Sequence, residues 1–273
     1  MTSRTLRMRP ATLKRKLKEL EQAIERGQHY RWYHTRDMPG SGTKTRLVCE
    51  KAALDELHLM SEAEHAEFLE GWYRDDVEVI REQEPLDRIK TQRAAAAINI
   101  DHPTYQPERE PAVLSTDMVY ITKRGKTYGL EARSVKSSRG GTECKPTRSQ
   151  LIEQKTWEDE GASYAIVRAN GMHVRRSKNL GWIFRAHNET VGRSLSDEEL
   201  VAQHELLRLF RTRKDMRVIN ACRSIDRVCD LPAGSGVRAF RQLAGSKKLA
   251  FDLNVADPLD ICLAEVWRPQ RKG

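Results

Sequence analysis

The stretch LSTDMVYITKRGKTYGLEARSVK, residues 114–136, decides the fold of the first part of the chain. Two runs rich in Val, Ile, Tyr and Thr flank the turn signal at residues 123–126, a pattern that predicts an antiparallel β-hairpin. Asp117 lies near the start of the first strand and Lys136 ends the second, although neither residue type favours strands. Because antiparallel pairing brings these two ends together, the hairpin predicts an acid and a base in one neighbourhood.

The composition is that of a folded, basic protein. Its 273 residues are 38% hydrophobic, which is sufficient for one large domain or two ordinary ones. The formal net charge of +9 favours a polyanionic partner, nucleic acid first, because Lys and Arg displace counterions from phosphates. No apolar run approaches the roughly 18 residues of a membrane span, so we expect a cytoplasmic protein. The five cysteines form no Cys-x-x-Cys pair, and we expect reduced thiols.

Basic residues are concentrated around the hairpin. Between residues 123 and 148, eight basic residues stand against two acids. We expect six of these basic residues to contact DNA: Lys123, Arg124, Lys126, Arg139, Lys145 and Arg148. A second basic run, residues 168–185, contains no acid, and its glycines and Trp182 favour a loop. For both runs, a solvated surface without a ligand is the alternative.

The segments around the hairpin follow a definite order. A helix at about 61–73 and a short strand at 77–80 come before it, separated from it by a proline-rich insertion that reaches Pro111. A helix at 146–160 and a buried strand at 163–169 come after it. The order is αβββαβ, typical of an α/β domain, which we assign to residues 1–170. The place of the insertion at 87–111 does not follow from the sequence.

A basic helix precedes this core. Leu and Ile recur at helical spacing from Leu13 to Ile24, and Gly27 follows as a stop signal. The aromatic residues Tyr30, Trp32 and Tyr33 come next, among histidines and arginines. They either anchor this helix, the interpretation we favour, or contact DNA.

Residues 171–273 are predicted to form a second, mostly helical domain. A capping box at Ser196 and Glu199 opens one helix, and helical spacing around Cys222 and Phe240 predicts two more. The alternation in KLAFDLN, residues 248–254, predicts a half-buried strand. Three helices followed by a strand pair are typical of a winged-helix module, a fold that binds DNA or protein with equal ease.

The residue types at the hairpin ends suit phosphodiester hydrolysis. Carboxylates bind Mg²⁺, and a lysine beside the scissile phosphate can orient or deprotonate water and offset negative charge. Strand alternation places Ser134 and Lys136 on one face and Glu131 on the other, so Glu131 is not expected at the site. Glu64, on the helix before the hairpin, is the third candidate acid. The alternative is that Glu64 only completes a capping box with Ser61.

Three motifs resemble a known family. LMSEAEHAEFLEGWYRDDVEVIREQEPL at residues 59–86, STDMVY at 115–120 and ARSVK at 132–136 are similar to the TnsA endonuclease subunit of heteromeric cut-and-paste transposons. The similarity is clearest from about residue 31 to 169 and fainter beyond. It implies a restriction-endonuclease-like αβββαβ core followed by a C-terminal winged-helix-like domain.

The resemblance also implies roles for single residues. Glu64, Asp117 and Lys136 fall on the catalytic glutamate, aspartate and lysine of the family. Mg²⁺ is the implied cofactor, with Mn²⁺ as a substitute, held by Glu64, Asp117, Ser134 and the carbonyl of Val135. The family has an acid or Gln where this chain has Ser134, which is a weaker ligand, so we expect the metal to be held partly through water.

Partners follow from the same resemblance. The family subunit cuts the non-transferred strand at the 5′ transposon ends, while a TnsB-type transposase performs 3′ cleavage and joining. A TnsC-type ATPase contacts the C-terminal domain, and the assembly works on the nucleoid. Two alternatives stay open: a free-standing restriction or repair nuclease, which would cut naked DNA alone, and a catalytically inert DNA-binding adaptor. In the adaptor, Asp117 would cap a strand and Lys136 would touch phosphate.

Overall fold

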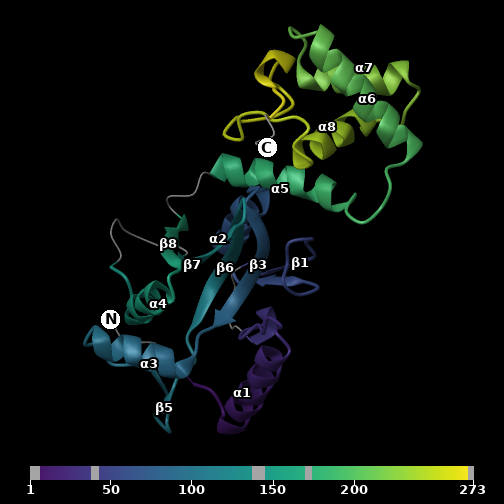
Figure 1. The fold of residues 1–273 in the computed structure, drawn as a ribbon. Helices are drawn as coiled ribbons and strands as arrows, with labels where there is room; N and C mark the ends of the chain where they lie inside the picture. The colour runs from purple at the N-terminus through teal and green to yellow at the C-terminus, as the bar shows by residue number, and fades with distance from the viewer. Residues whose placement is uncertain (1–6, 38–42, 137–144, 170–173, 270–273) are drawn as a thin grey trace. The chain divides into compact units, whose positions relative to one another are not determined.

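A computed structural model describes residues 7–37, 43–136, 145–169 and 174–269 (Figure 1). The chain is a mixed α/β protein, as predicted, and divides into two compact units, residues 1–172 and 173–273. Four of the five cysteines lie in the described ranges and carry free thiols. None of the helices in those ranges is both long and apolar enough to cross a bilayer.

The predicted hairpin is present in the first unit. Strand β6, Ser115–Arg124, pairs antiparallel with β7, Thr127–Lys136, and Arg124 stands opposite Thr127. The two-residue turn between them contains Gly125 at φ 64°, a left-handed conformation that favours glycine. The turn chemistry and the strand propensities therefore agree, which explains why this element is readable from the sequence.

The hairpin forms the centre of a four-stranded sheet with the order β3-β6-β7-β8 (Figure 1). Strand β3, Val77–Pro85, pairs antiparallel with β6, and β8, Ser163–Arg168, pairs parallel with β7. Helix α2, Glu62–Tyr73, precedes β3, and α4, Arg148–Asp159, connects β7 to β8. The predicted sequence of helices and strands is therefore found, with additions.

The additions correct the prediction for the insertion. Strand β3 continues to Pro85 instead of ending at residue 80, and helix α3, Arg88–Ala97, follows. A small sheet of β4, Thr104–Tyr105, and β5, Glu110–Pro111, completes the segment. The prolines misled because Pro85 and Pro111 are the last residues of their strands, where a missing N–H is tolerated. Four consecutive alanines then favour the helix.

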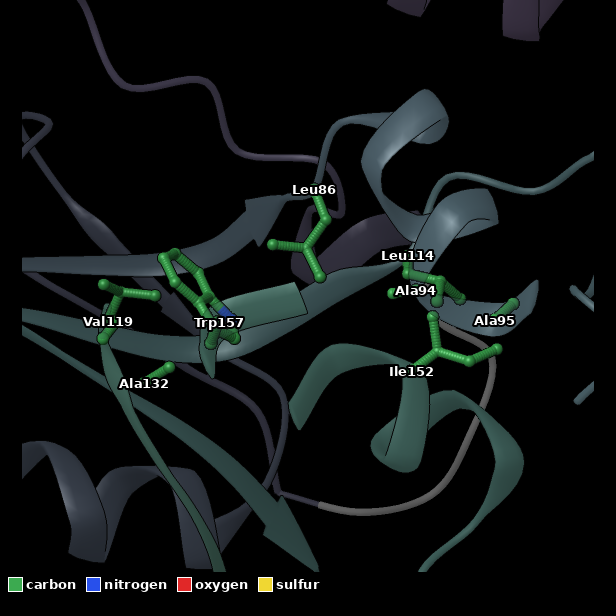
Figure 2. Close-up of a cluster of buried hydrophobic side chains, with 9 residues drawn as sticks. Leu86, Ala94, Ala95, Leu114, Val119, Ala132, Ile152 and Trp157 are labelled. Carbon is green, nitrogen blue, oxygen red and sulfur yellow. The ribbon is translucent and has the colours of Figure 1, made fainter. Parts of the chain in front are cut away.

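A buried apolar cluster fixes α3 and α4 to the sheet (Figure 2). Ile152 and Trp157 of α4 pack in this cluster with Val119 of β6 and Ala132 of β7. The indole N–H of Trp157 also donates to the hydroxyl of Thr116 at 2.8 Å. Because α4 is held by both packing and a buried hydrogen bond, the other side chains on this helix have fixed positions relative to β6 and β7.

The N-terminal helix is anchored by aromatic residues. Helix α1, Pro10–Glu25, is followed by Gly27 at φ 64°. Leu13 and Trp32 are buried in one cluster, against which Tyr30 and Tyr33 pack. The ammonium of Lys16 donates to the Trp32 carbonyl and lies 5.3 Å from the centre of its ring. These contacts support the anchoring interpretation. Two short strands follow the aromatic segment in the sequence. They are β1, Thr45–Leu47, and β2, Leu57–Leu59, which pair with each other antiparallel.

The second unit is built from four longer helices: α5, Val174–Asn188; α6, Asp197–Thr212; α7, Val218–Val228; and α8, Ser235–Gly245. A 3₁₀ turn, Leu263–Glu265, follows. The three helices predicted after residue 195 are found, and the Ser196–Glu199 capping box opens α6.

Two predictions for this unit are wrong. The basic run expected to be a loop lies largely in α5, where Leu180, Ile183 and Phe184 are buried at helical spacing and outweigh Gly181. The strand expected at 248–254 is absent from the described structure: its apolar residues are buried, but Ala250 makes only an isolated bridge with Trp267. The alternation of apolar and polar residues at 248–254 therefore reflects which side chains are buried, and it does not produce a hydrogen-bonded strand pair.

Candidate active site

Asp117 occupies the point where the hairpin strands stop pairing. The β6–β7 register ends at Met118 opposite Arg133. One residue beyond, the Asp117 carboxylate accepts a hydrogen bond from the Val135 N–H at 2.7 Å and a longer one from the Ser134 hydroxyl at 3.4 Å. The Gln83 amide donates to its other oxygen at 3.3 Å. Donors from β3 and β7 therefore fix the orientation of this carboxylate.

Gln83 is a site residue that the sequence did not reveal. Its backbone lies at φ 50°, a left-handed conformation that costs a non-glycine residue about 1 kcal/mol or more. In this conformation its side chain bridges β6, donating to Asp117 and accepting from the Ser115 hydroxyl at 3.4 Å. No local pattern signals it, because the contact joins residues far apart in the chain.

Glu64 lies in the first turn of α2 and is buried, with 5% of its surface exposed. Its N–H donates to the Ser61 hydroxyl at 3.2 Å, which is one half of the capping box considered as its alternative role. Its carboxylate accepts from the Met60 N–H at 2.9 Å and from the Ser61 hydroxyl at 3.1 Å, so it bonds to the amide before the cap residue. Glu64 is therefore held in place by the helix start, and the capping role does not remove it from the site.

The two carboxylates lie close enough to interact electrostatically. Burial raises the pKa of Glu64 to about 7, and the charge of Asp117 adds to the rise. Burial likewise raises the pKa of Asp117. No ion pair within the described ranges involves either carboxylate, so the structure concentrates negative charge at this point without a neutralising side chain. A bound cation would relieve this repulsion.

Lys136 follows Val135 in the chain, but its side chain is directed away from Asp117. The N–H of its neighbour Val135 binds Asp117, yet the Lys136 ammonium is exposed and donates to the Lys145 carbonyl at 3.3 Å. The structure thus brings Glu64 and Asp117 together and leaves the Lys136 amine outside their contact. Glu131 is also outside, as the alternation predicted: its carboxylate binds the Arg74 guanidinium through two hydrogen bonds of 2.7 and 2.9 Å.

Helix α4 contributes two buried polar residues that sequence reasoning missed. The Gln150 amide donates to the Ser134 hydroxyl at 2.9 Å. One turn later, Glu153 accepts long hydrogen bonds from Thr116 and Tyr164, both 3.4 Å. Burial, and secondarily the charge of Asp117, raises the pKa of Glu153 well above its ordinary range. The only sequence signal was the Thr147-x-x-Gln150 capping box.

Five of the six basic residues predicted to contact DNA lie in the described ranges, and they are divided between the two ends of the hairpin. Lys123, Arg124 and Lys126 lie at the turn, roughly 23 Å along the strand from Asp117 at 3.3 Å per residue. The ammonium of Lys123 pairs with Glu78 at 3.3 Å, and the Arg124 guanidinium pairs with an acid at 2.9 Å. Lys145 and Arg148 are exposed at the opposite end, near Lys136 in the chain. Arg139 lies outside the described residues.

The oxygen atoms at the site fit a hard cation, although no dense ligand cluster is present. In the described part of the chain, no three His, Cys, Asp or Glu side chains are grouped to hold a metal ion. The donors available are the carboxylates of Glu64 and Asp117, the hydroxyl of Ser134 and the main-chain carbonyl of Val135. All four are oxygen ligands of the kind that Mg²⁺ prefers.

Comparisons with known proteins agree with the motifs. Residues 173–253 match the family described as TnsA endonuclease C terminal, a range that begins at the first residue of the second unit. The chain is also 25% identical over 240 residues to the Transposon Tn7 transposition protein TnsA of Escherichia coli, covering 86% of this chain and 85% of that protein. These two matches confirm that this chain resembles the TnsA endonuclease, as its sequence motifs indicated.

Proposed function

We propose that this chain is the DNA endonuclease subunit of a transposition system and that it hydrolyses the non-transferred strand at the 5′ transposon ends. The observation that carries the proposal is the pair of interacting acids, Asp117 at the end of the β6–β7 ladder and the buried Glu64 at the start of α2. These are the two acids that the TnsA resemblance assigns to catalysis. The match to the Tn7 protein over 86% of the chain supports the transposition context.

In the proposed mechanism, the chain supplies two oriented carboxylates. The Val135 N–H and the Gln83 amide hold Asp117, and the Met60 N–H holds Glu64, so neither carboxylate has to reorganise when DNA arrives. Mg²⁺ held by these carboxylates with Ser134 and the Val135 carbonyl would neutralise phosphate charge and lower the pKa of a bound water.

Lys136 completes the proposed machinery. Among the described residues, its half-buried side chain bonds to the Lys145 carbonyl at 3.3 Å, which is a weak interaction to exchange for a phosphate. A short rotation of its flexible stem would bring the ammonium to the DNA backbone beside Asp117, where it would offset developing negative charge. Lys145 and Arg148 at the same end of the sheet would bind adjacent phosphates.

The two units would divide the work. The sheet order and the helices α2 and α4 support a restriction-endonuclease-like core in residues 1–170. We assign residues 171–273 to contacts with a TnsC-type ATPase, while a TnsB-type transposase would act beside the core. Helices α6, α7 and α8 support the relation to winged-helix modules, without the predicted strand pair. The assembly would work on DNA in the cytoplasm.

Helix α7 offers a DNA contact in the second unit. Its inner face is buried, and Arg217, Arg223 and Arg227 are exposed on the outside without an ion pair in the described structure. The nearby Asp226 does not oppose them, because its carboxylate accepts from the N–H groups of Gly234 and Gly236 at the start of α8. Charge complementarity therefore favours a phosphate backbone on this face.

The test is strand-resolved cleavage of transposon ends with the purified partner proteins, with and without Mg²⁺. Asp117→Asn should abolish the 5′ cut and preserve the partner's 3′ cut. Glu78→Gln on β3 is the matched control, since it removes a carboxylate that pairs with Lys123 away from the site. An unchanged 5′ cut in Asp117→Asn would support the inert adaptor, and cleavage of naked DNA without partners would support the free-standing nuclease.

A further inference from the structure

A chain of hydrogen bonds runs from the start of α4 into the proposed active site. The Thr147 N–H donates to the side-chain oxygen of Gln150 at 3.0 Å. The Gln150 amide nitrogen donates to the Ser134 hydroxyl at 2.9 Å. The Ser134 hydroxyl lies 3.4 Å from the Asp117 carboxylate, to which it donates. Gln150 and Ser134 are both buried, each with 5% of its surface exposed.

The Thr147 N–H determines which group donates and which accepts in each of these hydrogen bonds. A backbone N–H can only donate, so the Gln150 side chain must turn its oxygen toward Thr147 and its NH₂ group toward Ser134. Ser134 therefore accepts at that contact. Its single proton remains available for Asp117. Gln150 thus determines which way the Ser134 hydroxyl points.

We propose that Gln150 is a positioning residue of the active site, acting through Ser134 to hold Asp117 and the Ser134 oxygen in the geometry that receives a divalent cation. This inference rests on the proposed function. The short hydroxyl of Ser134 on β7 and the longer amide of Gln150 on α4 are joined by the 2.9 Å hydrogen bond beside Asp117.

The packing of α4 against the sheet holds Gln150 in a fixed position, as a positioning residue requires. Ile152 and Trp157 lie in the buried cluster of Figure 2, and the Trp157 indole bonds to Thr116, the residue before Asp117. The helix start and the aspartate are therefore fixed to the same strand. Residues that hydrogen-bond to metal ligands, without touching the metal, change metal affinity about 10- to 100-fold when they are replaced.

The first experiment measures Mn²⁺ binding to the full chain without DNA, by titration calorimetry. Gln150→Met removes the donor and keeps the length of the side chain, and it should weaken Mn²⁺ binding about tenfold or more. Gln154→Met is the matched control, because Gln154 lies on the same helix, is half-buried, and bonds only to Glu158 in the described structure. Wild-type Mn²⁺ affinity in Gln150→Met would overturn the proposal.

A double-variant cycle tests the route through Ser134. Ser134→Ala should weaken Mn²⁺ binding, and adding Gln150→Met to it should cause no further loss, because the connecting hydroxyl is already gone. Effects that multiply would show that Gln150 acts by another route and would overturn the proposal. Should Gln150→Met fail to fold, Ser134→Ala alone decides: affinity equal to that of the wild type contradicts the inference.

Cleavage separates this inference from the proposed function. In Gln150→Met, the Mg²⁺ concentration for half-maximal 5′ cleavage should rise by the same factor as the Mn²⁺ dissociation constant. If Asp117→Asn cuts normally, the proposed function fails. If Asp117→Asn is inactive and Gln150→Met has the wild-type Mg²⁺ requirement, only the role of Gln150 fails.

Discussion

Gly71 lies on α2, the helix that carries Glu64, and packs against Tyr120 of β6, the strand that carries Asp117. Replacing Gly71 with Ala should push this helix and this strand apart. A Cβ at this position would lie 2.4 Å from Cε1 of Tyr120 and 2.8 Å from its hydroxyl. Tyr120 of β6 is 1% exposed and donates to both the carbonyl and the carboxylate of Glu67 on α2, at 2.8 and 3.0 Å. It has no space to retreat without losing these bonds.

The expected cost follows from two opposing effects. Overpacking a buried contact costs about 1–3 kcal/mol, and the loss of the buried hydrogen bond that the single Tyr120 hydroxyl proton shares between the two Glu67 oxygens adds about 1 kcal/mol. Higher helix propensity of Ala offsets about 1 kcal/mol. Gly71→Ala should therefore destabilise the α2–β6 contact by roughly 1–3 kcal/mol, although the same substitution stabilises an unconstrained helix.

Amide hydrogen exchange of peptides from α2 and β6 in the full chain measures this locally. Tyr120→Ala provides the decisive background, because it removes the ring that the new methyl group would meet. There, Gly71→Ala should stabilise α2 by roughly 0.5–1 kcal/mol, a reversal of sign. Stabilisation by Gly71→Ala in the wild-type background would refute the close-packing argument.

Two further predictions concern the second unit. Glu199 accepts from Ser196 and from Arg193, which lowers its pKa from 4.5 to about 2, so its stabilising effect is complete above pH 4.5 and is lost as the pH falls through 2. Glu199→Ala should cost roughly 1–2 kcal/mol of unfolding free energy at pH 7 and much less near pH 2, measured by urea denaturation. Arg223→Ala with Arg227→Ala should weaken duplex DNA binding and reduce the slope of log K against log salt by about 2 in fluorescence anisotropy, whereas an unchanged slope contradicts a DNA contact at α7.

The predictable parts of the fold are those where local signals agree with tertiary packing. The hairpin turn carries Gly125 at a left-handed position, and α2 and α6 begin at serine caps. The misread parts are those where burial overrode local preference. Helix α5 contains Gly181 and Trp182, yet its apolar residues repeat at helical spacing and are buried. Helix α3 was not predicted because the prolines around it suggested an irregular insertion, whereas Pro85 and Pro111 end the strands β3 and β5.

The candidate site divides in the same way. Asp117 and Glu64 were accessible to sequence reasoning because unusual residue types stand at strand and helix ends, and the family resemblance then selected them. Gln83 and Gln150 were not accessible, because each acts across the sheet on a partner distant in the chain, 34 positions between Gln83 and Asp117 and 16 between Gln150 and Ser134. A polar residue in a strand or a capping box has an ordinary structural explanation until the contact is seen.

Several locally unfavourable features coincide at one place, and their coincidence supports a function better than any one of them alone. Gln83 adopts a left-handed backbone conformation, and burial raises the pKa of both Glu64 and Asp117, with the charge of Asp117 adding to the rise at Glu64. The strand ladder stops beside them. Natural sequences keep such costs chiefly where the arrangement has a use, and two fixed carboxylates without a countercharge are suited to a cation and a phosphate. The well-packed contacts of α2 through Tyr120 and of α4 through Trp157 hold this arrangement in place.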